Sequence, residues 1–269
     1  MMRTSNPALS EKAFGPGRTA VLDAGALAGG TVAAGPGIPA QVVGEPMTVG
    51  GVVEKSAFLL LLLVAAGAFG WSAVERTELG GPQIPGWVLL ALFAGLGIAV
   101  LTIFKPKLSP YTSPVYAIVE GLLVGAVSAV YDAQFAGIVL QAIGLTVGVF
   151  AIMLGLFALK IVKVTDRFRT GVIAATGAVM LVYVVSFVLR LLGTDIPFIH
   201  DSGLIGIGFS LAVVGLAAAN LLLDFDLITR GAEGGAPKYM EWYGAFALLV
   251  TLVWLYLELL RLLSKLRSR

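Results

Sequence analysis

The fold is decided by the segment Gly215–Glu241, which reads GLAAANLLLDFDLITRGAEGGAPKYME. It begins as the end of a long apolar helix and runs into two carboxylates, Asp224 and Asp226. Arg230 and a Gly-rich turn follow, and Glu241 then opens the next apolar run. Ionisable side chains in or beside a bilayer are costly and usually face a bundle interior or a water-filled cavity. The segment therefore predicts two membrane helices with a functional carboxylate cluster where they meet.

Composition extends this interpretation to nearly the whole chain. Apolar residues make up 58% of the 269 residues and charged residues only 13%, whereas soluble domains carry about 25% charged residues. Apolar runs of roughly 20 residues, long enough to span a hydrocarbon core, recur after residue 55. A transmembrane barrel would show short alternating segments instead. We predict an all-α polytopic membrane protein whose principal partner is the lipid bilayer.

Several kinds of chemistry are excluded. The chain has no cysteine, which rules out disulfides and thiolate metal sites. Its single histidine, His200, is expected in an exposed loop and makes a His-rich metal site improbable. No Ser/Lys pair, GxGD run or HExxH motif lies in the predicted helices, so we expect neither an enzyme nor a cofactor. We also expect no nucleic-acid partner.

Two domains are predicted. Residues 1–52 are rich in Gly, Ala and Pro and form a flexible N-terminal arm, because such a segment buries too little apolar surface to offset its ordering entropy. Residues 53–269 form a seven-helix transmembrane domain. The helices are expected at about 54–74, 86–104, 113–131, 135–160, 170–192, 203–226 and 242–263.

The distribution of Lys and Arg orients these helices. With the N-terminus in the cytoplasm of a cell-membrane protein, the Lys105–Lys107 turn and the basic Lys160–Arg169 loop lie inside, and the long outer connections carry only Arg76. The basic tail then lies outside, so either it tolerates this position or the last helix does not cross fully. We predict seven full crossings.

Glycine pairs four residues apart should let these helices approach closely. The pairs are Gly121/Gly125 and Gly144/Gly148.

This topology brings acidic side chains together near the cytoplasmic side. Glu120 is expected about 8 Å inside the third helix, Asp226 ends the sixth, and Glu241 begins the seventh. Carboxylate oxygens suit hard cations such as calcium, and carboxylates that share a low-dielectric site retain a proton. The three residues are therefore a candidate site for calcium or protons, at which pH could control the helices.

Each acidic residue also has a structural interpretation. Asp226 can form a gating ion pair with Arg230 at i+4 or be a solvated helix-end residue. Glu120 can be a hydrogen-bonded glutamate that joins two helices, and Glu241 an interfacial anchor beside aromatic residues. Asp224 lies about 200° around the helix from Asp226, so only one of them is expected to face the interior. Glu258, about 25 Å from Glu241, suggests an interfacial ion pair with Arg261.

Three motifs in this order resemble the Bax inhibitor-like (transmembrane Bax inhibitor motif) family: VEGLLVGAVSAVYD (from Val119), LLLDFDLI (from Leu221) and WLYLELLRLL (from Trp254). The start RTSNPAL and the segment APKYMEWYGAFALLVTLVWLYLE resemble its actinobacterial-type branch. The resemblance implies a seven-helix fold with a central last helix and a pH-sensitive calcium leak. It also implies a closed state latched by carboxylates of the sixth and seventh helices, with Asp226 as the sixth-helix member. Its partner is open: the motif gives Glu258, depth gives Glu241, and spacing gives Thr251 or Leu252.

The sequence is compatible with two classes of function. The first is slow permeation of calcium or protons, gated by carboxylates at the cytoplasmic end. The alternative is a membrane protein that does not transport and instead binds other membrane proteins, for example as a modulator of a protease or of stress, with structural carboxylates.

Overall fold

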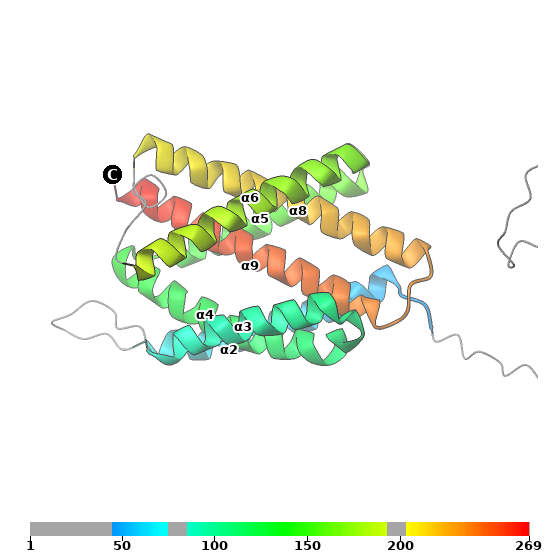
Figure 1. Cartoon of the computed structure of the whole chain (residues 1–269), viewed down its shortest axis with the longest axis horizontal. Helices are drawn as coiled ribbons and strands as arrows, with labels where there is room; N and C mark the ends of the chain where they lie inside the picture. The colour runs from blue at the N-terminus through cyan, green and yellow to red at the C-terminus, as the bar shows by residue number, and fades with distance from the viewer. Residues whose placement is uncertain (1–44, 75–84, 193–202, 269) are drawn as a thin grey trace, which may run out of the picture. The chain divides into compact units, whose positions relative to one another are not determined.

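A computed structural model describes residues 45–74, 85–192 and 203–268, which are almost entirely helical. Seven helices of this part are long and apolar enough to cross a membrane, which confirms the predicted all-α architecture. The arm up to residue 44 and the connections with Arg76 and His200 lie outside the described residues. In chain order the elements are α2 (Val49–Ser72), α3 (Trp87–Phe104), the 3₁₀ helix η3 (Pro106–Leu108), α4 (Ser109–Gln134), α5 (Ile138–Ala158), α6 (Asp166–Leu191), α8 (Leu204–Glu233) and α9 (Met240–Arg267) (Figure 1).

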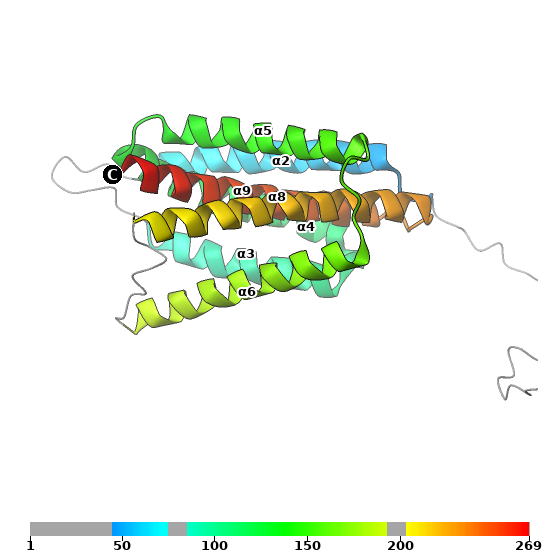
Figure 2. The ribbon, with the colours of Figure 1, turned by 90° about the horizontal axis from the view of Figure 1, so that it is seen from above.

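Successive helices run in alternating directions, which gives the bundle two distinct ends (Figures 1 and 2). One end holds the start of α2, the α3–α4 turn, the α5–α6 connection and the α8–α9 turn. We call it the basic end, because Lys105, Lys107, Lys160 and Lys163 belong to these connections. The other end, where α9 finishes, is called the far end.

The first helix starts earlier than predicted. α2 begins at Val49 rather than near residue 54, so residues 49–52 are helical and do not belong to the arm. The cause is an N-cap: the Thr48 hydroxyl accepts a hydrogen bond of 2.9 Å from the Gly51 N–H. The preceding residue, Met47, is buried, and its N–H donates to the carbonyl of Ala236 at 2.7 Å. These bonds tie the start of α2 to the α8–α9 turn.

Two other helix boundaries move the acidic residues deeper than predicted. α8 continues to Glu233 instead of ending at Asp226, and the i,i+4 ion pair between Asp226 and Arg230 stabilises the added turns. α4 begins at Ser109 instead of near residue 113. Glu120 consequently lies about 16 Å along α4, about twice the predicted depth, because each helical residue advances about 1.5 Å.

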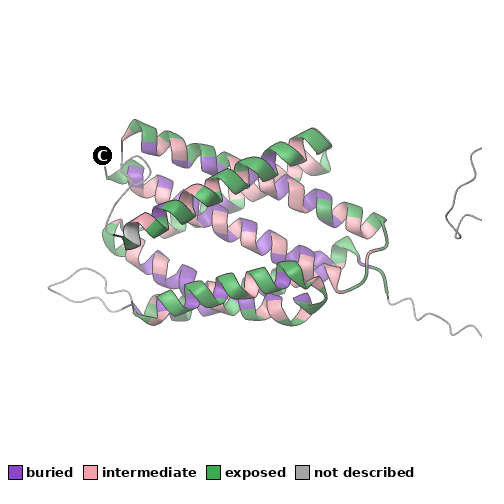
Figure 3. Ribbon diagram, in the orientation of Figure 1, coloured by how far each residue is buried: buried purple, intermediate pink, exposed green. Residues whose placement is uncertain are grey.

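The last helix forms the centre of the bundle. α9 is the most buried of the seven, followed by α4 and α8, whereas α2, α3, α5 and α6 expose most of their apolar surface (Figure 3). A large exposed apolar surface is costly in water and is expected where lipid surrounds the protein. The burial pattern therefore matches a bundle with α9 in its core and the four outer helices facing lipid.

Close approach of α2 and α4 depends on glycine. A Cβ at Gly125 would overlap the backbone carbonyl of Gly67, and one at Gly121 would overlap that of Leu63. This pair therefore acts as predicted. The second pair does not: no atom lies within 4 Å of a Cβ placed at Gly144 or Gly148. The small residues of α5 consequently leave open space instead of a helix contact.

Two basic residues of the tail have hydrogen-bond partners on other segments of the protein. Lys265 is buried and donates to the Gly206 carbonyl and the Ser210 hydroxyl, both at 3.0 Å. Arg267 donates to the Ala136 carbonyl at 2.9 Å and to Gln141 at 3.0 Å. Protein groups thereby compensate charges at the far end.

Candidate functional site

Among the described helices, α6 has the smallest packing contact with the rest of the bundle. Among the described helices its extensive packing contact is with α8 alone, and it lies at one side of the bundle in Figure 2. Three polar side chains on one face of α6 add to this contact. Arg169, Thr176 and Tyr183 are seven residues apart, which places them on successive double turns of one helical face. We call them the α6 polar ladder.

Each member of the ladder has a polar partner on a core helix. Arg169 donates to Asp226 of α8 at 2.5 Å. Thr176 accepts from the Asn220 side chain of α8 at 2.8 Å. Tyr183 donates to Glu258 of α9 at 2.8 Å. The ladder therefore joins α6 to the core along its length, with an ionisable carboxylate near each end.

Asp226 is the carboxylate of the ladder nearest the basic end. Only 12% of its side chain is exposed, and its second oxygen accepts from Arg230 Nε at 2.9 Å. The two arginines connect different parts of the protein. Arg169 links α6 to α8, whereas Arg230 lies on the same helix as Asp226. Arg230 also donates to the Val164 carbonyl at 3.4 Å. The predicted Asp226–Arg230 ion pair is thus present, and Arg169 adds an interhelical bond to it.

A cavity of about 240 Å³ lies beside this ion pair. Its lining residues come from α6, α8, the first turns of α9 and the segment before α2. They include both arginines together with the apolar side chains of Met47, Met240 and Tyr243. The cavity places the Asp226 ion pair next to a hollow at the basic end of the bundle.

Asp224 faces a different neighbour. Its carboxylate lies near the Thr251 side chain on α9, whose hydroxyl donates to the Ala247 carbonyl at 3.2 Å. The Oδ2 atom of Asp224 is buried with no partner among the described residues. Asp224 therefore faces α9 while Asp226 faces α6, so both point to neighbouring helices, contrary to the expectation that only one would. The α9 residue nearest to Asp224 is thus a threonine and not a second carboxylate.

Glu120 lies between α3 and α4. It lies close to Tyr116, one turn earlier on the same helix, and its Oε2 would be 3.1 Å from a Cβ at Gly95 of α3. The Tyr116 ring in turn packs edge-on against Phe246 of α9, with ring centroids 5.0 Å apart. Glu120 therefore lies at the α3–α4 contact, one turn from a residue that packs on α9.

Glu241 is fully buried and binds the start of α2. It accepts from the backbone N–H and the hydroxyl of Thr48, each at 2.9 Å, and pairs with Lys55 at 2.5 Å. A Cβ at Gly51 would overlap its carboxylate, so glycine is needed for this approach. Negative charge at a helix N-terminus is stabilising. Exposed Lys238 lies 3.5 Å away, and its hydrogen bond with Glu45 raises the pKa of that lysine.

Glu258 forms a second buried cluster, nearer the far end. It is 1% exposed, and its Oε2 accepts from Arg261 at 2.7 Å in addition to Tyr183. The guanidinium also donates to the Tyr183 hydroxyl at 2.8 Å. The predicted Glu258–Arg261 pair is therefore present, but it lies inside the protein rather than at an exposed interface. Its other oxygen, Oε1, is buried without a partner in the described part of the chain.

The carboxylates are consequently divided among separate contacts. Within residues 45–74, 85–192 and 203–268, no three His, Cys, Asp or Glu side chains are grouped to hold a metal ion. The structure does not assemble the predicted site of Asp226, Glu120 and Glu241. The reason is geometric: Glu120 lies deeper and faces α3, while Glu241 is occupied by the start of α2.

The residues of the α6 polar ladder were missed from sequence. Arg169 was assigned to a loop because the predicted helix began at residue 170, whereas α6 begins at Asp166. Tyr183 was not singled out within an apolar run. The seven-residue spacing of Arg169, Thr176 and Tyr183 is the signal that would have identified them.

Comparison with known proteins places this architecture in a family. The sequence model of the family described as Bax inhibitor 1 like matches residues 6–268, nearly the whole chain. The chain belongs to this family. No curated protein matches it. In this Bax inhibitor 1-like protein the sixth-helix aspartate, Asp226, is held by two arginines, and both candidate partners on α9, Glu241 and Glu258, bond elsewhere.

Proposed function

We propose that this Bax inhibitor 1-like membrane protein provides a slow, pH-sensitive leak for calcium or protons, which Asp226 keeps closed at the basic end. The observation that carries the proposal is the interhelical bond between Asp226 and Arg169. This bond attaches α6, the described helix with the smallest packing contact, to the core helix α8 beside a cavity. The basic end is taken as cytoplasmic, since Lys and Arg gather on that side of cell-membrane proteins.

Opening would follow from the loss of charge on Asp226. A side chain without charge at this position forms no ion pair with either guanidinium, so loss of the charge weakens the link between α6 and α8. A calcium ion would compete for the same oxygens, because carboxylates are the ligands that calcium prefers. Separation of α6 would expose Asp226, Asn220 and Glu258 in order along the bundle, which supplies polar groups for a cation across an otherwise apolar region.

Flux into liposomes tests this proposal. Wild-type protein and Asp226→Asn would be reconstituted with a trapped calcium or pH indicator, and flux measured from neutral to acidic pH. We expect wild-type flux to rise on acidification and Asp226→Asn to give the acidic-pH flux at every pH. Flux that is unchanged by the substitution at all pH values would contradict the proposal.

A non-transporting interaction protein is favoured by one specific observation: Glu241 and Glu258 are both engaged in buried ion pairs that stabilise helix contacts. This alternative predicts no flux above protein-free liposomes. It also predicts that Asp226→Asn lowers Tm and leaves flux unaltered, and that the protein purifies with membrane-protein partners.

A further inference from the structure

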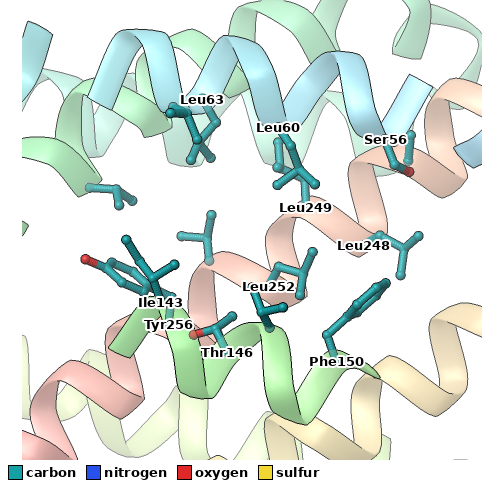
Figure 4. A pocket seen from close by; sticks show the side chains of 15 residues that line it. Ser56, Leu60, Leu63, Ile143, Thr146, Phe150, Leu248, Leu249, Leu252 and Tyr256 are labelled. Carbon is teal, nitrogen blue, oxygen red and sulfur yellow. The ribbon is translucent and has the colours of Figure 1, made fainter. Parts of the chain in front are cut away.

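A second cavity lies on the side of the bundle, away from the α6 polar ladder. Its volume is about 350 Å³, and it forms a groove between α2 and α5 with α9 as its floor (Figure 4). The rim side chains Leu60 and Val64 of α2 and Ile143 and Val147 of α5 are exposed, whereas the floor residue Leu249 is buried. The groove therefore opens sideways, in the part of the molecule that faces lipid.

The groove has a side chain with a hydroxyl at each end and mainly apolar side chains between them. Ser56 lines it near the start of α2, at the level where Lys55 and Phe58 contact the ring of Trp242. Tryptophan at a helix end marks the interfacial layer of a membrane. From there the lining continues through apolar side chains to Tyr256, and Figure 4 shows Ser56 and Tyr256 toward opposite ends.

The hydroxyls in the groove are not equivalent. Thr146 donates to the Ala142 carbonyl at 2.8 Å, and Tyr256 bonds to Ser128 at 2.7 Å. The Ser56 hydroxyl is buried and has no partner among the described residues. A buried polar group without a partner is costly, so a ligand that bonds to it would be favoured.

The dimensions identify the occupant. Ala245 and Tyr256, which bound the floor on α9, are eleven residues apart, or about 16 Å along the helix. One leaflet is half of a hydrocarbon core of about 30 Å, or about 15 Å. A helix from a second chain is about 10–12 Å wide with its side chains, so it could place only side chains in a groove of this volume, whereas one acyl chain could lie along its whole length. We propose that the groove binds one acyl chain of a membrane lipid, whose ester carbonyl accepts a hydrogen bond from Ser56.

Photochemical labelling tests this site in the full-length protein. The protein would be reconstituted in phosphatidylglycerol–phosphatidylethanolamine liposomes that contain a phospholipid with a diazirine in the middle of one acyl chain. After illumination, labelled peptides would be mapped by mass spectrometry. We expect label on α9 between Leu248 and Tyr256, because the groove is the route by which a lipid chain reaches this central helix.

Matched variants make the result decisive. Ile143→Trp fills the groove and should lower the labelling of α9 by about tenfold or more. The control Ile152→Trp, at an exposed position of α5 outside the groove, should leave the labelling of α9 unchanged. Ser56→Ala removes one hydrogen bond and should weaken labelling about fivefold with no loss of folded protein. Label spread evenly over the exposed faces of α2 and α5 and unaffected by Ile143→Trp would overturn the proposal. Crosslinks between two protein chains at the groove would overturn it as well.

Discussion

The two arginines that hold Asp226 allow a matched test of the proposed closing bond. Arg169→Gln and Arg230→Gln remove the same charge from the same carboxylate, but only Arg169 joins two helices. If separation of α6 from α8 opens the leak, then Arg169→Gln should open it and Arg230→Gln should have little effect. The comparison controls for the loss of one positive charge at the basic end.

The contacts give the expected size of each effect. A hydrogen bond to a charged group contributes about 1.5–3 kcal/mol. The Arg169 side chain is 37% exposed, so solvent screening lowers this to about 1–2 kcal/mol. That free energy changes an equilibrium by about 5–30-fold. Arg230 is 53% exposed and forms an i,i+4 pair, which is worth about 0.3–0.5 kcal/mol, or about twofold.

The assay is calcium flux into liposomes at neutral pH, with equal amounts of folded protein for each variant. Arg169→Gln should raise flux about 5–30-fold and Arg230→Gln about twofold. In the Asp226→Asn background, Arg169→Gln should add little, because the bond is already lost. Equal effects of the two arginine variants, or a larger effect of Arg230→Gln, would show that the bond between Arg169 and Asp226 does not keep the leak closed.

Other contacts lead to separate predictions. Gly125→Ala should destabilise the bundle by about 1–3 kcal/mol, because the added methyl group overlaps α2. Gly144→Ala adds a methyl group in open space and should stabilise the bundle by up to about 1 kcal/mol. Thermal unfolding in detergent would compare the two variants, and equal Tm values would argue against close α2–α4 packing. Glu241→Gln leaves Lys55 without its buried partner and should lower stability by about 3 kcal/mol, measured as a fall in Tm of roughly 6–12 °C; an unchanged Tm would show that the pair does not hold α2. Tyr183→Phe removes the bond from α6 to Glu258 and should raise flux about fivefold; unaltered flux would exclude this end of the ladder from the closed state.

The fold could be predicted from sequence because its cause is local. Long apolar runs determine membrane helices without reference to any partner, and the seven helices were found on that basis. Helix ends were less predictable, because they depend on contacts with distant residues. The start of α2, for example, is fixed by Thr48 and its bonds to Glu241, which lies 193 residues later in the chain.

The candidate site could be predicted only in part, because some of its contacts also depend on residues that are distant in the chain. Asp226 and its pair with Arg230 follow from i,i+4 spacing within one helix. The contact with Arg169 spans 57 residues and depends on which face α6 turns toward α8. Depth along a helix does not specify that orientation, so Glu120, Asp226 and Glu241 could be placed in one region but not assigned their separate neighbours.

The distance between α6 and α8 at the basic end would show most directly whether Asp226 holds these two helices together. The chain has no cysteine, so spin labels can be attached at Thr170→Cys and Glu233→Cys alone; both residues are exposed. Pulsed electron paramagnetic resonance in liposomes would then report the distance at neutral and acidic pH. We expect the distance to increase on acidification, and Asp226→Asn to show the longer distance already at neutral pH. A single distance distribution at both pH values and in both proteins would contradict it.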